Sequence, residues 1–392
     1  MPPRLGFGAH RISTAAHASA LRRSLDLGVC GLIDTSPNYG ESERIVGRVV
    51  REWREHRGEE RELTVVTKVG VLQGADLADA HERELRGRPW PGVLKLSPDA
   101  WHCISPEYIE HSVWRSLAAL GSPPDVVLLH NPEFFIADQL ARGRHTAAAT
   151  SAAAVAADDS GRCEDLYDGF YARLGDAFAA LAACHGGRFG VSSNLVGCRY
   201  GVSGRANDAE AVELARVVRA AEEGCGAAAE RCSVVQLPVN LLEPDAVAGG
   251  ASAPVAEARA RGFTVLSHRP LHAIPPAEGL GGGFGLTSAR HLTLRDGRPT
   301  LPAAALVRNT AREALAPHLP DAASLALEDI ALLYAMHAPN VDVVLTGMRS
   351  AEYVDAAARL LRQPPLSPEA HADLTAAMLR LISELQGELA SR

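Results

Sequence analysis

Eight short apolar runs recur along the chain, and each is bounded by glycine, proline or polar residues. Most of these runs are continuous rather than alternating, which is typical of parallel strands that are buried on both faces. The predicted strands are Leu5–Gly8, Leu32–Asp34, Leu63–Lys68, Val126–His130, Phe189–Ser192, Val234–Pro238, Thr264–His268 and Val343–Gly347. A sheet made of such strands needs helices to cover it.

Segments with helical periodicity lie between these runs. One of them opens with Ser105, Pro106 and Glu107, which supply a capping side chain, a proline for the first turn and an early acidic residue. Another is followed by Gly28, a residue type at which helices commonly stop. The predicted helices are Ala18–Leu27, Glu43–Glu55, Ser105–Leu120, Tyr167–Cys184, Asp208–Glu222, Leu325–His337, Glu352–Leu361 and Ser367–Leu389.

The alternation of strands and helices predicts an α/β fold, a (β/α)8 TIM barrel in a single domain of residues 1–392 with a C-terminal helix. A doubly wound sheet is the alternative, but no G-x-G-x-x-G follows the first strand. Three connections are long: Gly70–Ser105, the alanine-rich insertion Gln139–Asp165 and the glycine-rich Gly279–Pro302. The insertion is compatible with an exposed helix or with an irregular segment. Because these connections follow strands, we expect them to rise over the active-site face of a barrel.

Composition narrows the classes of function. The chain has 392 residues, 47% of them apolar, so it can bury a large core. Its net charge of −8 argues against a broad nucleic-acid-binding surface. The seven cysteines are scattered without a C-x-x-C pair, so we expect reduced thiols rather than a disulfide framework or a metal site. No signal core opens the chain and no apolar stretch approaches a membrane span, so we expect a cytoplasmic protein.

Four polar residues with useful chemistry lie at or just past the ends of predicted strands. In chain order they are Asp34, Tyr39, Lys68 and His130, and the tyrosine sits in the turn S-P-N-Y-G. The carboxyl ends of barrel strands meet at one face, so the four side chains can converge there. Their order and the sequence around the tyrosine resemble the active site of the aldo-keto reductases.

This resemblance implies a division of labour in carbonyl reduction. A carbonyl that accepts a hydride becomes an alkoxide unless a proton arrives, and Tyr39 would supply that proton. A free phenol has a pKa of about 10, and the ammonium of Lys68 would lower it. Asp34 would pair with Lys68 and hold it in place, while His130 would donate to the carbonyl oxygen and orient it.

The resemblance extends along nearly the whole chain and implies a nicotinamide cofactor. The segment F-G-V-S-S-N resembles a fifth-strand segment whose serine and asparagine bind the nicotinamide amide. An extra serine intervenes here, so Asn194 and either Ser192 or Ser193 are the implied ligands. Gln236 resembles the sixth-strand glutamine that completes these contacts.

Two later segments would hold the rest of the dinucleotide. In L-S-H-R-P-L, His268 falls where the family usually stacks an aromatic ring on the nicotinamide, and Arg269 would reach the pyrophosphate. Gly347, Arg349 and Ser350 resemble the segment around the adenosine phosphate. An arginine there suits a 2′-phosphate, which implies NADP as the cofactor in preference to NAD.

The leading interpretation is an NADP(H)-dependent oxidoreductase that acts on a small-molecule carbonyl or alcohol, such as an aldehyde, a ketone or a sugar. Either direction of the reaction is compatible with these residues. The alternative is a regulatory protein of the same fold that binds the cofactor with little turnover, similar to the potassium-channel β-subunits. A third interpretation is a Schiff-base lyase that uses Lys68. We expect neither a nucleic acid nor a membrane as a partner.

Overall fold

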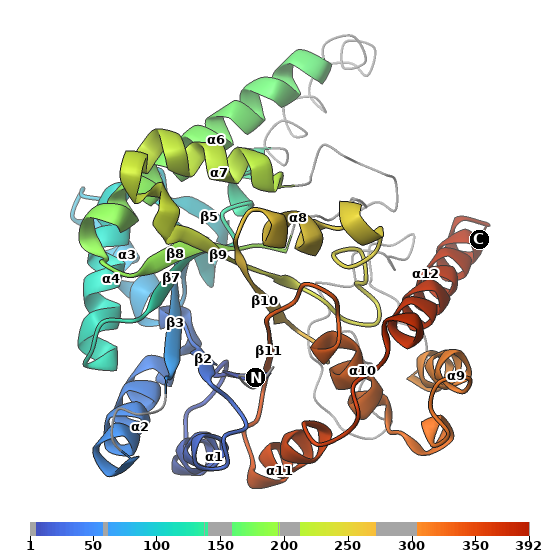
Figure 1. Ribbon diagram of the computed structural model, residues 1–392. Helices are drawn as coiled ribbons and strands as arrows, with labels where there is room; N and C mark the ends of the chain where they lie inside the picture. Colours follow the sequence, from blue (N-terminus) through green and yellow to red (C-terminus); the bar gives the residue numbers. More distant parts are fainter. Residues whose placement is uncertain are drawn as a thin grey trace.

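The structure is a computed structural model that describes residues 5–57, 62–136, 138–139, 159–194, 196, 212–271 and 304–391. Eight parallel strands form a closed barrel in the order β1-β11-β10-β9-β8-β7-β3-β2, with helices around the outside (Figure 1). The barrel strands are β1 (Leu5–Gly8), β2 (Leu32–Asp34), β3 (Thr64–Val69), β7 (Val126–His130), β8 (Arg188–Ser192), β9 (Cys232–Pro238), β10 (Thr264–His268) and β11 (Val343–Thr346). The predicted TIM barrel and its eight strands are confirmed, and the doubly wound alternative is wrong.

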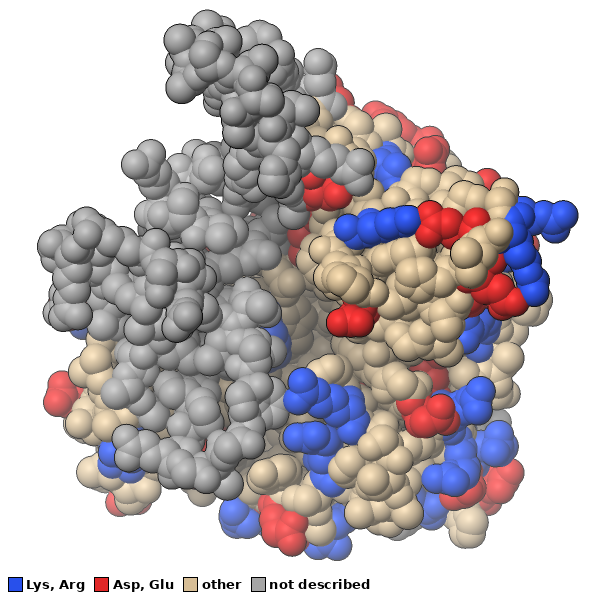
Figure 2. Space-filling model, turned by 180° about the vertical axis from the view of Figure 1, so that it is seen from behind, with Lys and Arg blue, Asp and Glu red and all other residues tan. Residues whose placement is uncertain are grey.

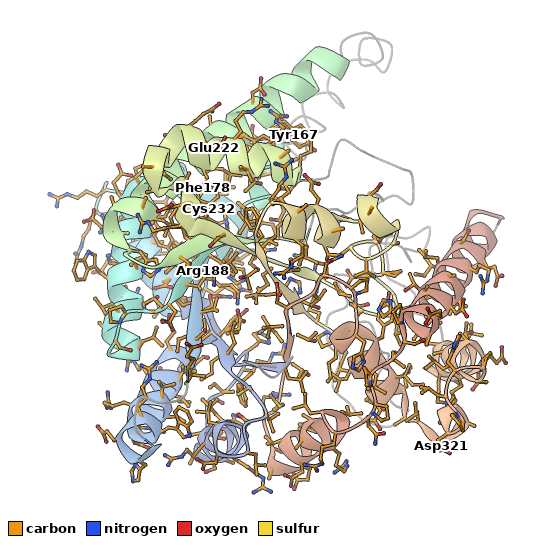
Figure 3. All side chains as sticks on the ribbon, viewed as in Figure 1. Tyr167, Phe178, Arg188, Glu222, Cys232 and Asp321 are labelled. Carbon is orange, nitrogen blue, oxygen red and sulfur yellow. The ribbon has the colours of Figure 1, made fainter. Side chains whose placement is uncertain are left out.

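The first strand closes the barrel because it pairs with a neighbour on each side. Phe7 lies opposite Ile33 on β2, and Leu5 lies opposite Val344 on β11. At the amino-terminal ends of the strands, Arg188, labelled in Figure 3, ties three strands together. Its guanidinium donates to the Ser233 carbonyl over 3.1 Å and to the Thr264 hydroxyl over 2.5 Å.

The helices cover the barrel from outside, and an apolar core lies between the two layers. Ser105 caps α4 by accepting from the backbone N–H of Tyr108, as the sequence predicts. The helix expected over Asp208–Glu222 begins later than expected, because Val212 pairs with Val196 in a β-bridge before the helix starts. Residues 208–211 lie outside the described part of the chain. The helices are α1 (Ala15–Asp26), α2 (Ser42–Arg57), α4 (Pro106–Leu120), α6 (Asp159–Cys184), α7 (Leu214–Cys225), α8 (Pro254–Ala260), α9 (Ala304–Leu315), α10 (Leu327–Met336), α11 (Ala351–Leu360) and α12 (Pro368–Ser391).

The long connection after β3, Gly70–Ser105, folds into a small unit that we call the β3 excursion. It contains α3 (Ala75–Leu85) and a three-stranded sheet in the order β4-β6-β5, paired antiparallel. The strands are β4 (Val71–Leu72), β5 (Leu94–Ser97) and β6 (Ala100–His102). The sheet escapes sequence prediction because β4 has only 2 residues and three of the four residues of β5 are exposed.

Other expectations fall partly outside the described residues. Of the alanine-rich insertion, residues 159–165 form the start of α6, and residues 140–158 are not described. The glycine-rich connection 279–302 is not described either. In the described ranges, no helix is long and apolar enough to cross a membrane. On the face seen in Figure 2, basic and acidic side chains are intermixed along the edge of the described surface.

Candidate active site at the carboxyl ends of the strands

The alternation of side chains along each strand gathers polar residues in the barrel. Leu32, Val66, Leu128 and Val234 belong to a buried apolar cluster on different barrel strands. The residue two positions further along a strand faces the same way, so it forms the next layer toward the carboxyl ends. Those residues are Asp34, Lys68, His130 and Gln236. We call this end of the barrel the mouth.

Lys68 is the centre of this layer, and its side chain is 1% exposed. Its Nζ donates to Asp34 Oδ2 over 2.7 Å, to the Tyr39 hydroxyl over 3.2 Å and to the Thr35 carbonyl over 3.3 Å. The structure therefore brings together an acid, a cation and a phenol, in hydrogen-bond contact, from β2, β3 and the turn between β2 and α2.

A short turn presents the tyrosine to the lysine. Residues Pro37–Tyr39 form one turn of 3-10 helix, in which the Tyr39 N–H donates to the Ser36 carbonyl over 3.0 Å. Gly40 follows with φ 67°, a backbone conformation that favours glycine. The chain then enters α2, and the Ser42 hydroxyl lies 2.7 Å from that of Thr35. Tyr39 is thus held by local structure rather than by a flexible loop.

Burial and charge act in opposite directions on Tyr39 and Lys68. Burial raises the pKa of Tyr39 above that of a free phenol, although the positive charge of Lys68 opposes the rise. Burial alone would lower the pKa of Lys68, but Asp34 and Tyr39 raise it above its ordinary value. At neutral pH the phenol is therefore protonated and the ammonium is charged.

His130 lies beside the tyrosine, with ring centroids 6.1 Å apart and planes nearly perpendicular. Burial, followed by the positive charge of Lys68, lowers the pKa of His130 far below its usual range, so the imidazole is neutral. Its backbone carbonyl accepts from Nε2 of His102 on β6 over 2.9 Å. The β3 excursion therefore braces the main chain of His130, a contact that sequence reasoning did not identify.

Gln236 connects the Lys68–Asp34 ion pair to Ser192 on β8. Its Nε2 donates to Asp34 Oδ1 over 2.8 Å, and its Oε1 accepts from the Ser192 hydroxyl over 2.6 Å. Ser193, the other candidate serine, is fully buried, and its backbone N–H donates to the Gln236 carbonyl. Ser192, Gln236, Asp34, Lys68 and Tyr39 thus form one continuous chain of hydrogen bonds across the mouth.

Asn194 is held in place by a residue that the sequence did not single out. Its backbone N–H donates to Oε1 of the buried Glu133 over 2.9 Å. The same oxygen accepts from Nδ2 of Asn131 over 3.0 Å, and the Asn131 N–H donates to the Ser192 carbonyl. Glu133 therefore joins the turns after β7 and β8, and no sequence pattern near it indicates this.

Arg269, the residue expected to bind the pyrophosphate, forms an ion pair with Glu243. His268 ends β10 and is half-buried, and Arg269 follows it with φ 57°. The Arg269 guanidinium lies 3.4 Å from Oε1 of Glu243, whose other oxygen accepts from Asn240 over 2.7 Å. This ion pair offsets the positive charge that Arg269 was expected to present to a phosphate.

The arginine that follows β11, unlike Arg269, forms no ion pair with the described residues. Arg349 has no ion-pair partner in the described part of the chain, and an added Cβ at Gly347 would meet only open space. Ser350 caps α11 by accepting from the backbone N–H of Tyr353 over 3.4 Å. The amino terminus of α11 and a guanidinium that forms no ion pair with the described residues therefore lie next to each other in the chain, and both favour an anion.

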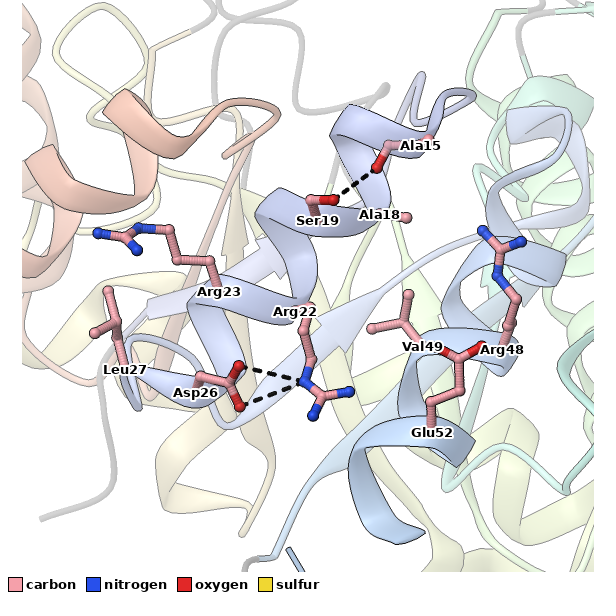
Figure 4. A pocket seen from close by; sticks show the side chains of 10 residues that line it. All are labelled: Ala15, Ala18, Ser19, Arg22, Arg23, Asp26, Leu27, Arg48, Val49 and Glu52. Carbon is pink, nitrogen blue, oxygen red and sulfur yellow. Dashed lines mark hydrogen bonds and ion pairs between the residues drawn. The ribbon is translucent and has the colours of Figure 1, made fainter. Parts of the chain in front are cut away.

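The described ranges contain no metal centre, and a large pocket in them lies away from the mouth. No group of three or more His, Cys, Asp or Glu side chains there is arranged to hold a metal ion. A pocket of about 510 Å³ lies outside the barrel, between α1 and α2 (Figure 4). It is lined partly by the half-buried pair Arg22–Asp26 and contains none of the residues at the mouth, so it is not the candidate active site.

Comparisons with known proteins agree with the barrel fold. Residues 4–163 match the model of the Aldo/keto reductase family. Aldo-keto reductase AKR11C1 from Bacillus halodurans, solved in its holo form, is 17% identical, with a TM-score of 0.54 over 95% of this chain and 91% of that chain. A second structure, provisionally assigned as a 2,5-diketo-D-gluconic acid reductase B, is 14% identical, with a TM-score of 0.50 over 95% of this chain and 87% of that chain.

At these identities the two structures show the fold alone, and no curated protein sequence matches the chain. The match to the family model over residues 4–163, together with the closed (β/α)8 barrel, supports the similarity of this chain to the aldo-keto reductases.

Proposed function

We propose that the protein is an NADP(H)-dependent oxidoreductase that transfers a hydride between nicotinamide and a small-molecule aldehyde, ketone or sugar, or the corresponding alcohol. The observation that carries the proposal is the buried contact of Lys68 with Asp34 at 2.7 Å and with the Tyr39 hydroxyl at 3.2 Å. A phenol beside a fixed ammonium is suited to give a proton to a developing alkoxide.

The residues at the mouth fit a nicotinamide dinucleotide. Each amide of Gln236 and Asn194 has hydrogen-bonding capacity left for a carboxamide, because an amide offers two donors and two lone pairs. At the other end, Arg349 and the amino terminus of α11 suit a 2′-phosphate, which favours NADP over NAD. When bound, the cofactor supplies or accepts the hydride.

Tyr39 acts as the general acid in reduction and as the general base in oxidation. Its raised pKa keeps the proton on the phenol at neutral pH until a stronger base, the developing alkoxide, is present. As that proton leaves, the Lys68 ammonium stabilises the phenolate. Asp34 prevents Lys68 from turning away, and Gln236 holds Asp34 from the other side.

His130 contacts the reacting oxygen. A neutral imidazole can offer one N–H or one lone pair without adding charge to the site, and the low pKa of His130 ensures that it stays neutral. The protonation of Lys68 argues against the lyase interpretation. Schiff-base formation needs an unprotonated amine, and Asp34 raises the pKa of Lys68 instead.

Mixing the protein with NADPH or NADH and a set of aldehydes, ketones and sugars tests the proposal. We expect NADPH oxidation with at least one carbonyl class and slower oxidation of NADH. Tight NADPH binding with no turnover on any substrate would favour the regulatory alternative. Trapping of a substrate on Lys68 by borohydride would favour the lyase.

A further inference from the structure

A chain of hydrogen bonds leads from the β3 excursion to the imidazole of His130. Gln73, which follows β4, accepts at Oε1 from Nδ2 of Asn38 over 3.1 Å. Oδ1 of Asn38 accepts from the Ser36 hydroxyl over 2.5 Å. The same hydroxyl oxygen lies 3.4 Å from Nδ1 of His130. Three residues outside the proposed chemistry are thus linked in series to the ring that contacts the substrate.

The number of donors along this chain of hydrogen bonds determines which nitrogen of the His130 ring carries the proton. A serine hydroxyl has one proton, and Ser36 gives it to Asn38. Toward His130 it can only accept, so Nδ1 carries the imidazole proton and Nε2 carries a lone pair. Burial and the nearby Lys68, His102 and His10 keep the ring from gaining a second proton. Nε2 has no partner in the described ranges, so its lone pair is left for a bound molecule.

The same heavy-atom positions allow the opposite arrangement. Turning a side-chain amide by half a turn exchanges its oxygen and nitrogen, so Gln73 would donate to Asn38 and Asn38 would donate to Ser36. Ser36 would then donate to Nδ1, and the ring proton would sit on Nε2. The exchange takes one proton from Nδ1 to water and one from water to Nε2, so the charge of the ring does not change. Each link keeps one donor and one acceptor in both arrangements.

We propose that Gln73, Asn38 and Ser36 are positioning residues that decide which nitrogen of His130 carries the proton, and hence whether the ring accepts from a substrate hydroxyl or donates to a substrate carbonyl. The arrangement in the structure favours the alcohol, and the reversed one favours the carbonyl. The link to substrate rests on the proposed function, whereas the choice of tautomer does not.

Two variants of Gln73 should move the proton in opposite directions. Glutamate can only accept, so Gln73→Glu locks the arrangement seen here and enriches the Nδ1–H form. Lysine can only donate, so Gln73→Lys enriches the Nε2–H form. The ¹⁵N shifts of His130, assigned by their loss in His130→Gln, report the ratio of the two forms. We expect the two variants to differ by about fivefold or more in this ratio, as one hydrogen bond would give.

Ser36→Ala distinguishes an effect carried by the chain of hydrogen bonds from a through-space effect of the new charge at position 73. In the Ser36→Ala background the link is broken while the charge at position 73 remains, so the two Gln73 variants should have the same tautomer ratio. Gln363→Glu and Gln363→Lys, at an exposed position beyond α11, are matched controls and should leave the ratio unchanged. Equal ratios in Gln73→Glu and Gln73→Lys, or a difference that survives Ser36→Ala, would overturn the inference.

Steady-state kinetics then test the link to substrate. Gln73→Glu should raise KM for the carbonyl relative to KM for the alcohol, and Gln73→Lys should do the reverse. The values of kcat/KM must change together in both directions, because the overall equilibrium constant is fixed. Opposite tautomer shifts with unchanged KM values would overturn the role of Nε2 in substrate binding. Absence of turnover in the unmodified protein would instead refute the proposed function. The tautomer ratios would still test whether Gln73, Asn38 and Ser36 control the tautomer of His130.

Discussion

Asp34 has a separate partner for each oxygen of its carboxylate. Oδ2 accepts from Lys68 over 2.7 Å and Oδ1 accepts from Gln236 over 2.8 Å. A buried ion pair contributes little net stability, because removing two charges from water offsets their attraction. Its value here is geometric, since it fixes the ammonium within 3.2 Å of the Tyr39 hydroxyl.

Lys68→Met should affect both folding and turnover. The variant leaves the Asp34 carboxylate buried without its cation, which typically costs about 3–5 kcal/mol of unfolding free energy. The double variant Asp34→Asn/Lys68→Met removes both charges and should recover much of that loss. Turnover should stay low in both, because the phenolate of Tyr39 has lost the ammonium. Denaturant unfolding and single-turnover rates measure the two effects. Rates near the wild-type value in the double variant would contradict the role of Lys68.

At the scale of elements, continuous apolar runs were sufficient to predict the barrel strands, because burial on both faces requires such runs. Asp34, Lys68 and His130 could be placed because they lie at or next to the ends of these strands. Contacts between loops could not be predicted. Gln73 and His102 reach the site through the β3 excursion, whose strands are too short or too exposed to show a pattern. Glu133 joins two turns that are far apart in sequence.

Helices α6 and α7 approach each other through two glycines. A Cβ added at Gly224 would lie 2.2 Å from the carbonyl oxygen of Gly175. Gly224→Ala should therefore lower the unfolding free energy by about 1–3 kcal/mol, despite the better helix propensity of alanine. Gly186→Ala is the matched control, because nothing lies within 4 Å of a Cβ there. Urea unfolding of both variants measures the difference, and equal midpoints would argue against this close helix contact.

The contact between α10 and α12 should depend on pH. The His371 ring stacks on Tyr334 with centroids 4.4 Å apart, and its Nε2 donates to the Tyr334 carbonyl over 3.1 Å. Burial lowers the pKa of His371 to about 4. The unfolded chain has a histidine pKa of about 6.5, so it binds this proton first as the pH falls. The stability due to a neutral His371 is therefore present above that value and is lost between about pH 6.5 and 4.

Comparison with His371→Gln isolates this contribution, because glutamine can donate but does not titrate in this range. The unfolding free energy of the wild type should fall more steeply than that of the variant as the pH drops, by up to roughly 3 kcal/mol. Other buried histidines, such as His102, titrate in both proteins, so their effect cancels in the difference. A difference between the two proteins that does not vary with pH would contradict a neutral, buried His371.

At the scale of the whole molecule, the candidate site depends on the closed barrel. Its residues come from β2, β3 and β7 on one side and from β8, β9, β10 and β11 on the other. The chain from Ser192 to Tyr39 can form only when these strands surround a common axis. A single domain of residues 1–392, with Gln139–Asp165 as an insertion, remains the organisation that we propose.

The preference for NADPH over NADH should depend on Arg349, which follows β11. Arg349→Ala removes the guanidinium proposed to meet the 2′-phosphate, so NADPH affinity should weaken by about 1.5–3 kcal/mol. NADH affinity should change little, because NADH lacks that phosphate. The exposed Arg362, in the turn after α11, provides the control variant Arg362→Ala. Fluorescence titration with both cofactors measures the affinities, and equal losses for NADPH and NADH would refute the contact.

Single-turnover oxidation of NADPH by Tyr39→Phe, at saturating cofactor with an accepted carbonyl substrate, tests the central claim most directly. The variant removes one hydroxyl, so folding and NADPH affinity should be preserved, and Tyr353→Phe on the exposed side of α11 controls for the substitution itself. A positioned general acid contributes about 10²–10⁴-fold in rate, so we expect the Tyr39→Phe rate to fall by at least about 100-fold. If Tyr39→Phe retains most of the wild-type rate, Tyr39 is not the proton donor, and the proposed mechanism is wrong.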